Sequence, residues 1–98
     1  MTEPSIGNLR PYTWDSEQSV AYEAAIEAIG AVVGAYSAML AAEAESHPAS
    51  QDEIAEYRRL RTACQEERKA LRAEDTENVA RVRCTYAARL RELSETGA

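Results

Sequence analysis

The sequence predicts an all-α fold: a three-helix bundle in which a long N-terminal helix packs on an antiparallel helical hairpin. The 98 residues include 19 Ala, 14 Glu and 10 Arg but only 4 Gly and 3 Pro, and Ala, Glu and Arg cost little free energy in a helix. Apolar residues recur at helical spacing, and helix-start motifs precede the later segments. The length fits one domain with one core.

Residues 1–13 are expected to form an irregular N-terminal arm, and residues 14–98 a single helical domain. The arm contains four residues that interrupt regular structure: Pro4, Gly7, Asn8 and Pro11. Thr13 or Asp15 can cap a helix after it, and Gln18 lies three residues after Asp15 as in a capping box.

The first expected helix runs to about Ser46. Its main apolar stripe repeats every three or four residues through Tyr22, Ile26, Ile29, Val33, Tyr36 and Leu40. This helix should end near His47, because a proline disfavours helical geometry in the residue before it and Pro48 follows.

Two more helices are expected after this break. Ser50 and Glu53 form a capping box ahead of Ile54, so the second helix should begin there. The apolar pattern lapses between Leu71 and Val79, which predicts a turn. Asp75 or Thr76 would then cap the third helix.

Four apolar pairs share one antiparallel register across this turn: Leu71 with Val79, Cys64 with Tyr86, Leu60 with Leu90, and Tyr57 with Leu93. The alternative is two long helices that form an extended hairpin or coiled coil, with one continuous helix from Gln51 to about Ser94. A helix of that length would need an oligomer to cover its apolar stripe.

The first helix is apolar on more than one side, which predicts an interface. A second stripe includes Val32 and Met39, and a third face carries Gly30, Gly34 and Ala38. A helix that is apolar nearly all round should be buried nearly all round. Because one small bundle leaves an outward face on each helix, we expect these five residues to contact a partner, and a homodimer is the expected assembly.

The charge distribution argues against a nucleic-acid-binding protein. The net charge is −6, whereas affinity for nucleic acid comes from basic surfaces that neutralise phosphates. The alternative hypothesis of a nucleic-acid-associated accessory protein depends on the cluster of Arg58, Arg59 and Arg61, which could equally contact a small anion. Glutamates interleave with these arginines, so a solvated or salt-bridged face is the preferred interpretation.

The sequence contains no catalytic motif, so we expect a protein that is not an enzyme and needs no cofactor or metal. It lacks Glu-x-x-His pairs, zinc-type Cys and His spacing, and Gly-rich phosphate loops. Cys64 and Cys84 are too few for a disulfide scaffold, and reduced thiols are expected. An enzyme or small-anion binder built on the five tyrosines and the arginines would require an inward pocket with convergent arginines.

A cytoplasmic location is expected, because the N-terminal segment has neither the basic start nor the apolar run of a secretory signal. The longest uncharged stretch, residues 28–42, is shorter than the roughly 20 residues of a membrane span, so no membrane association is expected. The predicted function is a small non-catalytic interaction or regulatory module that self-associates through its first helix. An acidic immunity or antitoxin-type binding protein, with an unidentified protein partner, is a further alternative.

Overall fold

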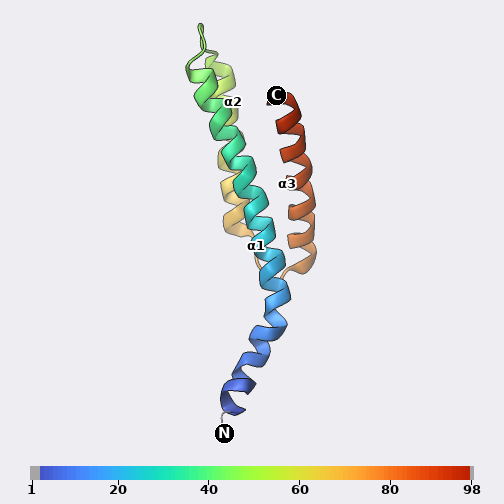
Figure 1. Cartoon of the computed structure of the whole chain (residues 1–98). Helices are drawn as coiled ribbons and strands as arrows, with labels where there is room; N and C mark the ends of the chain where they lie inside the picture. Colours follow the sequence, from blue (N-terminus) through green and yellow to red (C-terminus); the bar gives the residue numbers. More distant parts are fainter. Residues whose placement is uncertain (1–2, 98) are drawn as a thin grey trace.

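The computed structural model describes the backbone of residues 3–97 and the side chains of residues 16–95 (Figure 1). The chain forms three helices over this range: α1 (Glu3–Ala44), α2 (Gln51–Ala70) and α3 (Thr76–Gly97). α1 packs against both α2 and α3, and the described residues include no strand. The predicted all-α three-helix bundle is therefore confirmed.

α1 begins earlier than the sequence predicts. The backbone is helical from Glu3 onward, so the irregular arm expected over residues 1–13 is wrong from residue 3; residues 1 and 2 lie outside the described residues. Pro4 is in the first turn, where a helix does not use the missing N–H. Pro11 removes one internal hydrogen bond, and the N-terminal part of α1 bends away from the line of the rest (Figure 1).

The capping box at Ser50 fixes the start of α2. The Ser50 side chain accepts a 3.2 Å hydrogen bond from the Glu53 backbone N–H, as predicted. The Ser50 N–H in turn donates a 2.8 Å bond to Oε2 of Glu43, at the end of α1. This bond ties the connection between α1 and α2 to both helices.

The predicted turn between α2 and α3 is also confirmed. Leu71 leaves the helix with an extended backbone (φ −71°, ψ 136°), and its N–H donates to the carbonyl of Arg68. Oδ1 of Asp75 accepts a 3.2 Å hydrogen bond from the Asn78 N–H, which caps α3. The alternative of one continuous helix from Gln51 to Ser94 is therefore wrong.

α1 occupies the groove between the two arms of the hairpin. It runs antiparallel to α2 and parallel to α3 (Figure 1). Cα atoms of α1 approach both neighbours, but no Cα atom of α2 lies within 8 Å of α3. The molecule is elongated, 69 × 19 × 19 Å, because the N-terminal part of α1 continues past the turn of the hairpin.

The core lies along the inward face of α1 and takes in residues from all three helices. Its buried members are Ala25, Ile29, Val32, Tyr36, Cys64, Leu71, Val79, Val82 and Tyr86. The apolar residues of α2 and α3 that the sequence pairs across the turn therefore pack on α1 more than on each other. The hairpin can stay open because α1 presents an apolar face wide enough to fill it.

Candidate functional site

The side of α1 that faces away from α2 and α3 has no partner among the described residues. We define this outer face of α1 by its exposed residues: Val20, Glu23, Glu27, Ala31, Gly34, Ala38 and Ala41. They recur every three or four residues and so follow one side of the helix. Val20 is 67% exposed and is the only exposed large hydrophobic residue among the described side chains. From Ala31 to Ala41 the face is uncharged and consists of small residues.

Gly30 and Gly34 of α1 are not required by packing against the described residues. Gly34 is on the outer face and Gly30 is half-buried at its edge. A Cβ atom built at either position meets nothing within 4 Å. Each glycine costs about 1 kcal/mol relative to alanine inside a helix. Close packing inside the bundle therefore does not explain why glycine occurs twice, one turn apart.

The structure corrects one of the five predicted interface residues, and the interface itself stays a prediction. Gly34 and Ala38 lie on the outer face, and Gly30 at its edge. Val32, however, is fully buried in the core, and Met39 is half-buried against it. The bundle uses the second apolar stripe as well as the main one, because the groove between α2 and α3 is wide. Periodicity alone could not show which stripes of so apolar a helix would face inward.

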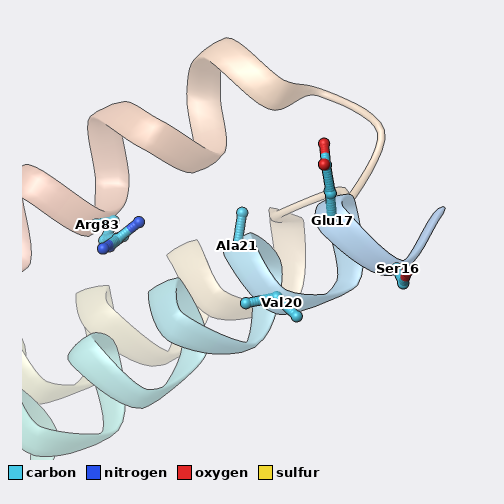
Figure 2. A pocket seen from close by; sticks show the side chains of 5 residues that line it. All are labelled: Ser16, Glu17, Val20, Ala21 and Arg83. Carbon is cyan, nitrogen blue, oxygen red and sulfur yellow. The ribbon is translucent and has the colours of Figure 1, made fainter. Parts of the chain in front are cut away.

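A shallow hollow of about 410 Å³ lies where α1 leaves the bundle. It is lined by Ser16, Glu17, Val20 and Ala21 of α1 and by Arg83 of α3. Figure 2 shows Arg83 on one side of Ala21 and Glu17 on the other. The hollow thus combines an apolar floor with a cation and an anion at its margins, and sequence spacing could not reveal it because Arg83 comes from a distant segment.

The predicted arginine cluster does not form one surface. Nη2 of Arg59 makes a 2.5 Å ion pair with Glu56, and Nη1 of Arg61 donates a 3.0 Å hydrogen bond to the Ser37 hydroxyl of α1. Arg58 is exposed. Two of the three guanidinium groups are therefore engaged within the chain and point to different partners.

A polar bridge joins α2 to α3 beside the core. Oε1 of Glu67 accepts a 2.8 Å hydrogen bond from the Tyr86 hydroxyl, and Oε2 makes a 2.6 Å ion pair with Arg81. The Arg89 guanidinium stacks 4.6 Å from the Tyr86 ring centroid and donates a 3.9 Å hydrogen bond to Sγ of Cys64. The predicted register places Glu67 of α2 level with position 83 of α3. Its two partners, Arg81 and Tyr86, lie on either side of that position.

These contacts change how the bridge titrates. The hydrogen bond from Arg81 lowers the pKa of Glu67, and the bond from Tyr86 acts in the same direction despite partial burial. Burial raises the pKa of Tyr86, as does the neighbouring Glu67 carboxylate. Glu67 is therefore ionised and Tyr86 neutral at neutral pH. Since Arg81 and Arg89 are both engaged, the bridge has the character of a structural link rather than of a binding site.

The remaining candidate groups give no chemical centre. Both cysteines are free thiols, Cys64 buried and Cys84 exposed, as expected. In the part of the chain whose side chains are described, no three His, Cys, Asp or Glu residues come together as a metal site. A second hollow, at the start of α3, is lined by Asp75, Glu77, Asn78 and Arg81 and is open to solvent.

One segment of α1 meets the length and composition of a membrane span. It comprises Ser16–Ala44, 29 residues, with a mean hydropathy of 1.6 in its most apolar window, of which 22% is buried inside the protein. The core helix of a soluble bundle meets the same criteria, and Ile29 and Tyr36 of this segment are core residues. The expected absence of membrane association stays a prediction.

Comparison with known proteins places the chain in no group. No protein-family model matches it, and neither a curated protein nor a solved structure does.

Proposed function

We propose that this protein is a small non-catalytic interaction module that self-associates through the outer face of α1. The observation that supports this most directly is the pair of glycines with open space at their Cβ positions. Glycine lets another backbone approach a helix closely, and Ala31, Ala38 and Ala41 extend the same smooth surface. A second helix packed there would bury a face that the chain itself leaves exposed.

The charge of the protein also favours a protein partner over nucleic acid. The protein is acidic overall, with a net charge of −6, and the outer face carries glutamates but no basic residue. Such a face would repel the phosphates of nucleic acid. An apolar helix surface with charges at its rim is instead typical of protein–protein interfaces.

Measuring the mass of the protein in solution tests the proposal. We expect light scattering to give the mass of a dimer for the wild-type chain and of a monomer for Gly34→Leu, because a leucine there would hold the partner helix away. Ala63→Leu, at an exposed position of α2, is the matched control and should leave the dimer intact. Circular dichroism should show unchanged helicity in both variants. An unchanged mass for a helical Gly34→Leu, or a monomeric wild-type protein, would reject the proposal.

A further inference from the structure

Two charged side chains at the hollow beside Val20 have no ion-pair partner among the side chains of residues 16–95. Glu17 and Arg83 both line this hollow, and neither forms an ion pair with another side chain that the structure describes. The three ion pairs among the described residues are Arg59–Glu56, Lys69–Glu66 and Arg81–Glu67. Val20, which lines the same hollow, is 67% exposed. The region is therefore an apolar patch with one unpaired charge of each sign.

Such a patch is complementary to a copy of itself. In a two-fold symmetric dimer every contact is made twice, so a contact between Glu17 of one protomer and Arg83 of the other occurs at two places. We propose that a second copy of this chain docks antiparallel on the outer face of α1, about a two-fold axis at Val20, with each Arg83 paired to the partner's Glu17. This arrangement rests on the proposed function and specifies the geometry of that interface.

The distribution of glutamates favours the antiparallel direction. Glu23 and Glu27 are exposed on the outer face, and a parallel in-register pair would set each against its own copy, which is unfavourable. An antiparallel pair about Val20 places Glu27 level with position 13 of the partner subunit instead. Glu23 comes level with the partner's Glu17. Positions 17 and 23 are about 120° apart around α1, so the two side chains project from opposite edges of the interface. Antiparallel pairing brings like edges together, so they do not meet.

The same arrangement covers the glycines. Gly34 is 14 positions from Val20, about 21 Å along the helix. In the antiparallel dimer it lies level with position 6 of the partner subunit. The α1 backbone is helical there and continues past the hairpin turn, where neither α2 nor α3 lies beside it (Figure 1). The projecting end of each α1 would therefore lie along the small-residue part of the partner's outer face.

Charge reversal tests the pairing. Arg83→Glu and Glu17→Lys should each raise the dimer Kd about 100-fold, because two symmetric pairs turn from attractive to repulsive at once. Mixing the two variants should restore dimerisation, since both pairs are then attractive in the heterodimer. Native mass spectrometry with one variant isotopically labelled would show this heterodimer. Arg91→Glu and Glu95→Lys, exposed on α3 away from the hollow, are the matched controls and should dimerise as the wild type does.

The outcomes separate the geometry from the proposed function. If Gly34→Leu is monomeric but the charge variants stay dimeric, or if their mixture stays monomeric, the outer face is the interface and the Arg83 to Glu17 pairing is wrong. If the wild-type protein is itself a monomer, both proposals fail. Circular dichroism of each variant confirms that loss of the dimer is not loss of fold.

Discussion

The Tyr86 hydroxyl of α3 donates a 2.8 Å hydrogen bond to the Glu67 carboxylate of α2. No Cα atoms of these helices lie within 8 Å of each other, so long side chains bridge them. The Tyr86 ring fills the core at 2% exposure, while its hydroxyl reaches the polar edge. One residue thus serves the apolar packing on α1 and the polar link between the arms of the hairpin.

Removing the Tyr86 hydroxyl should destabilise the protein without disturbing its core. Tyr86→Phe keeps the ring under Arg89 but loses a hydrogen bond to a carboxylate, which should cost about 1 to 2 kcal/mol. Urea denaturation measures the change. Tyr57→Phe is the control, because the Tyr57 hydroxyl bonds to Glu53 at an exposed site and its loss should cost less than about 0.5 kcal/mol. Equal effects of the two substitutions would contradict this account.

Because of the polar bridge, the free energy of unfolding should depend on pH through the ionisation of the Glu67 carboxyl group. Its pKa lies below the ordinary value of 4.5 in the folded protein, because Arg81 and Tyr86 donate hydrogen bonds to the charged form. The contribution of ionised Glu67 is therefore complete above the unfolded pKa and is lost as the pH falls through the lower folded pKa. Glu67→Gln should be less stable than the wild type at pH 7, and the gap should narrow as the pH falls below about 4.5. A gap that is independent of pH would rule out this role.

Removing the Ser50 cap of α2 should lower the free energy of unfolding independently of the polar bridge. Ser50→Ala removes the side-chain acceptor for the Glu53 N–H but keeps the backbone bond from Ser50 to Glu43. We expect a loss of about 1 kcal/mol in the free energy of unfolding. Ser46→Ala removes only an exposed bond to the Ala42 carbonyl and should be close to neutral. The same urea titration compares them.

Val32 should behave as a core residue and not as an interface residue. Because its side chain is fully buried, Val32→Ala should destabilise the fold by about 2 kcal/mol through lost burial and a cavity. The dimer mass should persist under conditions where the variant remains folded. Dissociation to a folded monomer of wild-type stability would instead place Val32 at the interface.

Local sequence patterns were enough to predict the three helices and their order. Short-range rules were enough, since the Ser50 capping box, the break at His47 and the cap at Asp75 depend on neighbours a few residues away. The predicted antiparallel register of the hairpin agrees with the structure at Glu67, which bonds to Arg81 and Tyr86 on either side of its predicted level. The four apolar pairs pack on α1 instead of on each other. Local signals misjudged only the start of α1, where Pro4 and Pro11 indicated irregular structure.

Which side of α1 faces outward depends on how the helix packs against α2 and α3. This helix is apolar nearly all round, so its pattern allowed several rotations, and the width of the groove between α2 and α3 selected one. That selection buried Val32 and exposed Gly34. It also brought Arg83 to Val20 and engaged Arg61 with Ser37. Contacts between residues so distant in sequence depend on packing free energy summed over the whole bundle, which no local pattern records.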